Sequence, residues 1–308
     1  MAWFPVQFIR PGTTFDFMGK RWYGFIVSIS LTVLALGLLF TKGLNLGIDF
    51  TGGVLLEIRT EQPADLSAIR NALGGQGFGE YSLQNFGDPR DVMIRIQLQD
   101  GVDQAQVVSK VKERVASVVS GTIDYRNIEF VGPAVGRELI RGGIIATLLS
   151  FVGIMAYLWF RFEWQYGVGG ILALLHDTIM MIGFFAFMRL DFGLTALAAI
   201  LTVIGYSIND SVVIYDRIRE NMRKYKKMSM SDLLNLSINE TLSRTIMTAG
   251  TTLLASLALA VFGGEVIKSF SWAMVFGVIV GTYSSIYISA PTLIYLALRA
   301  EKKQEAAA

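Results

Sequence analysis

Three ionisable residues lie within or directly beside long apolar stretches of this 308-residue sequence. Asp177 lies near the middle of one stretch, Asp210 lies toward the end of the next, and Arg244 directly precedes another. An ionisable side chain inside a hydrocarbon layer is costly and therefore indicates a functional site. A carboxylate whose proton affinity is set by burial beside a guanidinium is suited to proton transfer. We therefore interpret Asp210, Arg244 and Asp177 as a candidate proton relay.

Depth within the apolar layer favours a pairing of Asp210 with Arg244. Asp210 lies five residues before Tyr215, which is about 8 Å at the helical rise per residue. Arg244 begins the following stretch from the same side, and a long arginine side chain can reach a carboxylate at that depth. Polar neighbours that share the helix faces of the pair are expected to support it: Tyr206, Ser207, Asn209 and Thr248.

Each of these residues also has a purely structural interpretation. An Asp–Arg pair can be a clamp between two helices, and threonine stripes or the Gly277-xxx-Gly281 pair more often form packing faces. His176 can bond a backbone carbonyl and do nothing else. Asp177 is harder to explain by structure alone, because an unpaired carboxylate in a membrane would stay protonated.

The apolar stretches are long enough to cross a bilayer, which takes about 20 residues. Charged residues make up 17% of the chain, against about 25% in average soluble chains, and the mean hydropathy is +0.49. The first stretch is longer than a signal-peptide core and lacks a cleavage pattern, so we expect it to remain as an anchor. We predict an α-helical polytopic membrane protein with six transmembrane helices: Trp22–Phe40, Gly142–Phe160, Trp164–Met188, Phe192–Tyr215, Thr245–Gly264 and Ser269–Leu298.

Between the first two stretches lies a polar insert of about 100 residues, whose patterns alternate between strand and helix. The expected strands are Val54–Arg59, Glu80–Phe86, Val92–Leu98 and Thr122–Phe130, and the expected helices are Asp65–Leu73 and Asp103–Val119. The order strand, helix, strand, strand, helix, strand predicts a ferredoxin-like α+β domain.

The distribution of basic residues predicts the orientation, because short cytoplasmic loops are rich in Lys and Arg. Fourteen basic residues fall on the side of the two termini, whereas the short loops on the other side hold only Arg189 and Lys268. Both termini are therefore expected in the cytoplasm. The predicted organisation is a cytoplasmic segment 1–21, a first transmembrane helix 22–40, a periplasmic domain 41–141, a five-helix transmembrane bundle 142–298 and a cytoplasmic tail 299–308.

Composition and missing motifs exclude several classes of protein. With no cysteine and one histidine the chain offers no disulfide framework and no ordinary zinc site, so we expect no metal and no bound cofactor. A net charge of +2 does not indicate nucleic-acid binding. No phosphate-binding glycine loop or H-E-x-x-H motif occurs, so we expect no enzyme. An intramembrane hydrolase using the two aspartates is a distant alternative; labelling of either aspartate by an aspartyl-protease probe would favour it.

Six motifs then resemble one family over about Asp16 to Leu298. They are Gly47–Gly53, Phe130–Leu139, Arg161–Trp164, His176–Asp177, Val203–Asn221 and Arg244–Thr252. In sequence and order they are similar to the SecD/SecF family of protein-export membrane proteins, within the resistance-nodulation-division superfamily. This resemblance implies six spans and one periplasmic domain in the bacterial inner membrane. It also places the proton-coupling Asp and Arg of the family on Asp210 and Arg244, and leaves the roles of Asp177 and His176 undefined.

The resemblance implies partners that composition could not reveal. They are SecD, the SecYEG channel, the accessory proteins YajC and YidC, unfolded preprotein and membrane lipids. With SecD, such a chain would use the proton-motive force to drive late preprotein translocation, so that the proton gradient is its energy source. The alternative is a stand-alone proton-coupled transporter of a small solute, which would be active without a second polypeptide.

Overall fold

The computed structural model describes residues 14–74, 81–98, 102–264 and 267–296 of the chain. The predicted tail 299–308, the first thirteen residues and Glu80 lie outside the described residues. The chain divides into two compact units. The first contains the described residues up to Asn45, Thr147–Leu190 and the described residues from Thr195 onward, and the second contains Leu46–Ala146 and Asp191–Leu194.

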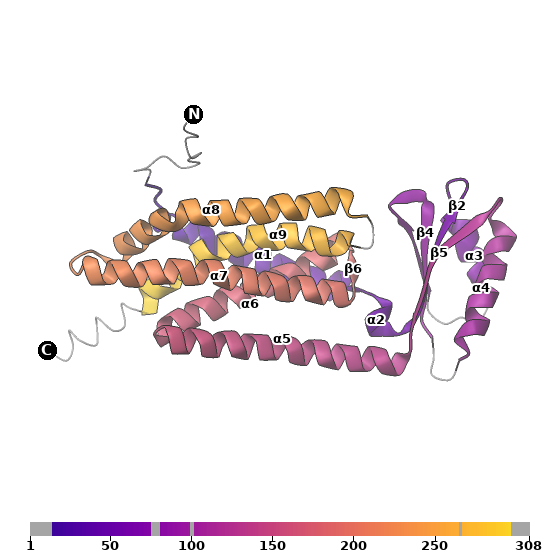
Figure 1. Cartoon of the computed structure of the whole chain (residues 1–308), viewed down its shortest axis with the longest axis horizontal. Helices are drawn as coiled ribbons and strands as arrows, with labels where there is room; N and C mark the ends of the chain where they lie inside the picture. The colour runs from indigo at the N-terminus through magenta and orange to yellow at the C-terminus, as the bar shows by residue number, and fades with distance from the viewer. Residues whose placement is uncertain (1–13, 75–80, 99–101, 265–266, 297–308) are drawn as a thin grey trace, which may run out of the picture. The chain divides into compact units, whose positions relative to one another are not determined.

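Six of the described helices are long and apolar enough to cross a membrane, which confirms the number of predicted spans (Figure 1). They are α1 (Arg21–Lys42), α5 (Pro133–Arg161), α6 (Trp164–Met188), α7 (Leu194–Lys224), α8 (Met230–Phe262) and α9 (Lys268–Ser284), the last continuing to Leu296. The continuation includes η1, a π-helical turn at Ser285–Ser289. Because π turns are rare and concentrate at functional sites, this turn indicates that the last span belongs to a functional site.

Two of the helices extend well beyond the stretches that hydropathy predicted. α7 continues past Tyr215 to Lys224, and α8 begins fifteen residues before Thr245. At the start of α8, the Ser229 side chain accepts a hydrogen bond from the Asp232 backbone N–H and caps the helix. Hydropathy detects only the part of a helix that suits lipid, so these polar extensions were not predicted.

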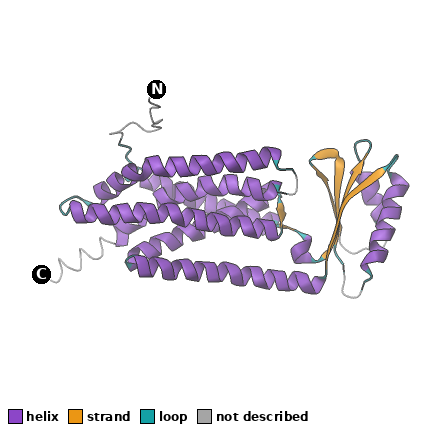
Figure 2. Ribbon diagram, viewed as in Figure 1, coloured by secondary structure: helices purple, strands orange, loops and turns teal. Residues whose placement is uncertain are grey.

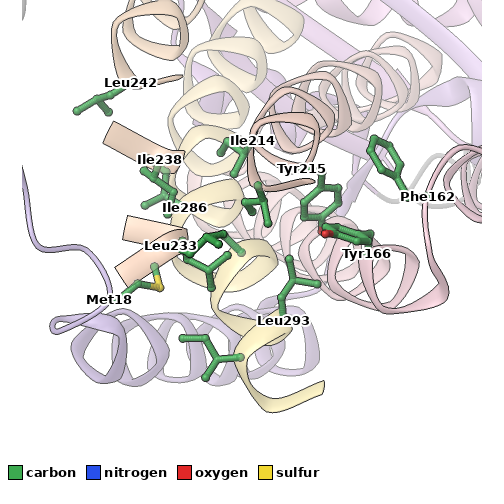
Figure 3. Packing of buried hydrophobic residues seen from close by; sticks show 14 of the residues in the cluster. Met18, Phe162, Tyr166, Ile214, Tyr215, Leu233, Ile238, Leu242, Ile286 and Leu293 are labelled. Carbon is green, nitrogen blue, oxygen red and sulfur yellow. The ribbon is translucent and has the colours of Figure 1, made fainter. Parts of the chain in front are cut away.

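An apolar core holds these extensions together at one end of the first unit (Figure 3). Tyr166, Tyr215 and Phe162 form edge-to-face or tilted ring contacts there. The extension of α8 contributes Leu233, Leu234, Ile238 and Leu242. These side chains precede the predicted fifth span, so burial from water, worth roughly 1.5–3 kcal/mol for each large side chain, stabilises them.

Glycines allow the membrane helices to pack closely. A Cβ atom at Gly277 of α9 would lie 2.3 Å from Cγ2 of Val203 in α7, and one at Gly281 would lie 3.0 Å from Cβ of Ser207. Both pairs are separated by the same number of residues in sequence, so α7 and α9 run parallel in one register. A third contact of this kind joins Gly183 of α6 to Ala35 of α1.

The second unit contains a four-stranded antiparallel sheet with two helices (Figure 2). Its elements are β2 (Gly53–Thr60), α3 (Leu66–Leu73), β3 (Tyr81–Phe86), β4 (Asp88–Ile96), α4 (Gln104–Val118) and β5 (Ile123–Val131), and the strand order is β3-β4-β2-β5. The carboxylates of Asp65 and Asp103 accept backbone N–H bonds and cap α3 and α4. Val54, Leu56 and Ile58 of the central strand β2 pack against the helices.

Three short elements connect the unit to the spans: β1 (Asn45–Leu46), the single-turn helix α2 (Ile48–Thr51) and β6 (Asp191–Phe192), with β1 and β6 paired. Residues 191–194 had been assigned by sequence to the five-helix bundle. The structure instead places them in the second unit, because Phe192 lies in a strand and α7 begins only at Leu194.

We predict that Gly277→Ala lowers the thermal unfolding midpoint of the detergent-solubilised protein, because the new methyl group would overlap the branched side chain of Val203. Overpacking of this kind costs about 1–3 kcal/mol. Gly250→Ala in α8 is the matched control, since no heavy atom lies within 4 Å of its Cβ position. The control should keep or gain stability, and equal midpoints for both variants would contradict the close packing.

Candidate functional site

Asp177 is completely buried and is held by groups from three helices. Its Oδ2 accepts hydrogen bonds from the hydroxyls of Ser207 in α7 at 2.6 Å and Ser284 in α9 at 2.8 Å. Its Oδ1 lies 3.1 Å from Nδ1 of His176, its neighbour in α6. A buried charge is tolerated only when paired and hydrogen-bonded, so this set of donors can accommodate the carboxylate inside a span.

His176 contributes through one ring nitrogen only. Nδ1 contacts Asp177, whereas the buried Nε2 has no hydrogen-bond partner in the described part of the chain. The imidazole ring lies 6.3 Å from the ring of Tyr283, whose hydroxyl donates to the Gly24 carbonyl of α1 at 2.6 Å. The described contact of the His176 ring is therefore with its neighbouring carboxylate, and not with the backbone carbonyl that a purely structural role would use.

Asp210 is also buried, but only one of its oxygens is bonded. Oδ1 accepts a hydrogen bond from the Thr245 hydroxyl of α8 at 2.6 Å. Oδ2 is buried and has no described partner within normal hydrogen-bond geometry, and the Ser285 hydroxyl of the last span interacts with the carboxylate. A buried carboxylate oxygen without a close donor is an exception to the usual satisfaction of buried polar groups and calls for an explanation.

The ion pair of Asp210 with Arg244 is not formed in this structure. Arg244 is exposed in the isolated chain, and no ion pair within 4.0 Å joins it to any described carboxylate. Thr245, the next residue, takes the place facing Asp210, because successive helical residues point about 100° apart. Depth in the membrane, on which the pairing was based, does not fix this rotation. The Arg244 charge still acts on Asp210 from a distance.

The four residues that were expected to support the Asp210–Arg244 pair do not all contact Asp210. Ser207 bonds Asp177 rather than Asp210. Tyr206 is partly buried and interacts with the hydroxyls of Thr248 and Thr282 and with the charge of Asp210. Thr248 itself donates to carbonyls of its own helix. Asn209 is exposed, so it does not give Asp210 the support that its neighbouring position predicted.

Sequence reasoning missed a ladder of hydroxyl groups between α7 and the last span. Ser211 bonds Ser285 at 3.0 Å, and one turn further on the Tyr215 hydroxyl bonds Ser289. All four residues are buried. The run Ser284-Ser285-xxx-Ser289 in an otherwise apolar stretch was the available signal, and it coincides with the π turn. Within the described residues, no group of three His, Cys, Asp or Glu side chains could hold a metal ion.

Comparison with known families gives this arrangement a context. The family "Protein export membrane protein SecD/SecF, C-terminal" matches residues 110–299, and the "SecD/SecF GG Motif" matches residues 37–64. "Protein translocase subunit SecF" of Rickettsia akari is 48% identical over 299 residues, covering 97% of both chains. The protein of the same name from Rickettsia felis is 48% identical over 304 residues, covering 99% of both.

Solved structures show the same fold. The crystal structure of SecDF from Thermus thermophilus matches with a TM-score of 0.82 and 38% identity over 93% of this chain. SecDF in its super-membrane-facing form matches with a TM-score of 0.72 and 36% identity over 99% of this chain. The chain spans only 39% and 41% of those two longer chains.

Fold, motifs and relatives define a multi-pass membrane protein of a protein-export machinery, and the chain belongs to the SecD/SecF family of protein-export membrane proteins. It is a subunit of the Sec translocase. Its family match includes both Asp177 and Asp210, together with the helices that supply their hydroxyl partners.

We predict that Thr245→Val destabilises the protein by about 1–3 kcal/mol, because it leaves the buried Asp210 carboxylate without its hydroxyl donor. The valine keeps the shape of the side chain. Thr251→Val is the matched control in α8, since the Thr251 hydroxyl donates only to the carbonyls of Met247 and Thr248. Chemical unfolding in detergent measures both variants, and indistinguishable curves would show that the bond to Asp210 is dispensable.

Proposed function

We propose that this subunit couples proton entry to protein export without performing catalysis itself, and that Asp210 carries the proton. The observation that carries the proposal is the half-satisfied carboxylate: one oxygen bonded to Thr245, the other buried without a close donor in the described structure. The transmembrane potential supplies about 2.3 kcal/mol per charge per 100 mV, and no bound cofactor is required.

The proposed cycle follows from the charges on α7 and α8. When Asp210 is ionised, the positive charge of Arg244 attracts it and favours close approach of the two helices. Protonation from outside removes that attraction and leaves a neutral acid that can itself donate a hydrogen bond. The neutral Asp210 acid can then form hydrogen bonds other than the one to Thr245, so α7 and α8 can shift. Release of the proton to the inside restores the first arrangement.

Asp177 has a supporting role in this proposal. Because Ser207, Ser284 and His176 already satisfy it, it fixes α6, α7 and α9 relative to one another. It is available to exchange a proton only when one of these donors moves away. We therefore place Asp177 second in the relay and expect its loss to weaken coupling less than the loss of Asp210.

We further propose that the second unit is a ferredoxin-like periplasmic domain and that both termini face the cytoplasm of a cell with an inner membrane. The antiparallel order β3-β4-β2-β5 with two crossover helices supports this fold. The excess of basic residues in the loops on the terminal side supports the orientation. A domain on the outer face is suited to bind and release unfolded chain as it emerges.

The partners proposed for this subunit are SecD, the SecYEG channel, YajC, YidC and unfolded preprotein. The SecDF chains are more than twice as long as this one, which supports a second polypeptide that supplies the remaining helices. Arg244, exposed on the membrane part of α8, is where a partner helix would be expected to complete the relay.

We predict that Asp210→Asn abolishes proton-driven completion of export in proteoliposomes containing the SecD complex and the channel. Asparagine keeps the size of the side chain and an acceptor for Thr245 but cannot take up a proton. Asp216→Asn is the control on the same helix, because Asp216 forms an exposed pair with Arg161 at 2.7 Å. Preprotein protection from protease and proton uptake are both measured; normal values for Asp210→Asn would refute the relay.

The orientation is tested by single-cysteine labelling, which the absence of native cysteine allows without background. Ser67→Cys in the second unit is expected to react with an impermeant maleimide in spheroplasts. Lys226→Cys, between α7 and α8, is expected to react only after the membrane is broken. Both positions are exposed, so the reverse pattern would mean that the chain is inserted the other way.

A further inference from the structure

Glycine-rich residues Gly47–Gly53 form a junction within the second unit. They follow α1 and lead directly into β2, the central strand that pairs with both β4 and β5. Their short helix α2 buries Ile48 and Phe50. Two other pieces of chain contact this segment: the start of α5 and the connector 191–194 between α6 and α7. The junction therefore joins the sheet to the beginnings of two membrane helices.

Asp49 makes the polar contact to α7. Its Oδ2 accepts the backbone N–H of Leu194, the first residue of that helix, at 2.8 Å. The first N–H groups of a helix have no partner inside the helix, and a carboxylate there is favoured by the helix dipole. Asp49 thus acts as an N-cap supplied by a distant segment. The capped helix is the one that carries Asp210, about 24 Å further along at the helical rise.

Three glycines make these contacts possible because a Cβ atom at each would lie 3.0 Å or less from a neighbouring atom. A Cβ atom at Gly193 would lie 2.5 Å from the Asp49 carboxylate, and one at Gly136 of α5 would lie 3.0 Å from the Phe50 carbonyl. Gly52, which has a positive φ of 70°, would approach Pro133 to 2.8 Å. At Gly136 and Gly52 backbone packs on backbone, so few rotatable side chains are there to absorb a displacement.

The connector is fixed by a second set of contacts. The Gly47 N–H donates to the Phe192 carbonyl at 3.0 Å, and the rings of Phe50 and Phe192 lie 6.0 Å apart. Arg95 of β4 forms an ion pair with Asp191 at 2.9 Å. Burial raises the pKa of the Asp191 carboxyl, as do the charges of Asp49 and Glu129, and the Arg95 guanidinium opposes this shift.

We propose that Asp49 is a positioning residue of the export cycle: by holding the first N–H of α7, it transmits displacements of that helix to the central strand of the second unit. The proposal rests on the proton-driven function proposed above. It assigns a role to the glycine motif that its sequence alone does not reveal, since the glycines provide close contact and the aspartate provides the link. Removing the acceptor should uncouple proton movement from preprotein movement.

The test compares Asp49→Ala with Asp49→Asn in the full chain, reconstituted with SecD and the channel. Asparagine keeps an acceptor oxygen for the Leu194 N–H, whereas alanine does not. We expect Asp49→Ala to lose most preprotein translocation with proton uptake retained, and Asp49→Asn to retain both. Hydrogen exchange of the peptide covering Leu194 should be faster in the alanine variant only.

A second pair of variants guards against failure of Asp49→Ala to fold. Gly193→Ala should reproduce the uncoupling by displacing the carboxylate, whereas Gly132→Ala, with no heavy atom within 4 Å of its Cβ position, should behave as wild type. Three results would each overturn the proposal. They are wild-type translocation in Asp49→Ala, equal defects in Asp49→Ala and Asp49→Asn, and a parallel loss of proton uptake and translocation. Asp210→Asn in the same assay tests the proton-driven function separately, through proton uptake. The Asp49 proposal is tested by the difference between the two Asp49 variants in translocation and in hydrogen exchange.

Discussion

A carboxylate inside a hydrocarbon layer must find hydrogen-bond donors, and this requirement organises the membrane unit. Asp177 meets it with hydroxyls from α7 and α9 and with the histidine beside it in α6. The bonds are short enough only because Gly277 and Gly281 let α7 and α9 approach each other closely. In lipid, where helices gain little by burying apolar surface against one another, such close packing and polar contacts provide the association.

The two buried aspartates show how the same residue type serves two purposes. Both carboxylate oxygens of Asp177 have polar partners, which come from three helices. Asp210 has one close hydroxyl donor, and its other oxygen has no partner within normal hydrogen-bond geometry in the described structure. The first arrangement joins three helices, and the second joins only α7 and α8 by a close hydrogen bond. The proposed proton-driven function requires both: a fixed group of helices and a site on that group whose bonding can change.

The sequence was sufficient to predict what depends on composition along the chain, and insufficient for what depends on rotation between helices. Six spans and the order of strands and helices in the insert follow from hydropathy and periodicity. The partner of Asp210 does not, because Arg244 and Thr245 differ in depth by only about 1.5 Å and differ mainly in direction. Ser207 was assigned to the wrong aspartate for the same reason. The hydroxyl ladder with Ser285 and Ser289 required knowledge that α7 and α9 are parallel neighbours.

The second unit is assembled from two pieces of chain that lie far apart in sequence, 46–146 and 191–194. The short piece supplies the carboxylate for Arg95, which is 8% exposed, and the Leu194 N–H for Asp49. Excising the long piece alone would therefore remove the Asp191 carboxylate from Arg95 and the Leu194 N–H from Asp49. In an exchange of the long piece between homologues, these two contacts keep their original partners only if residues 191–194 are exchanged with it.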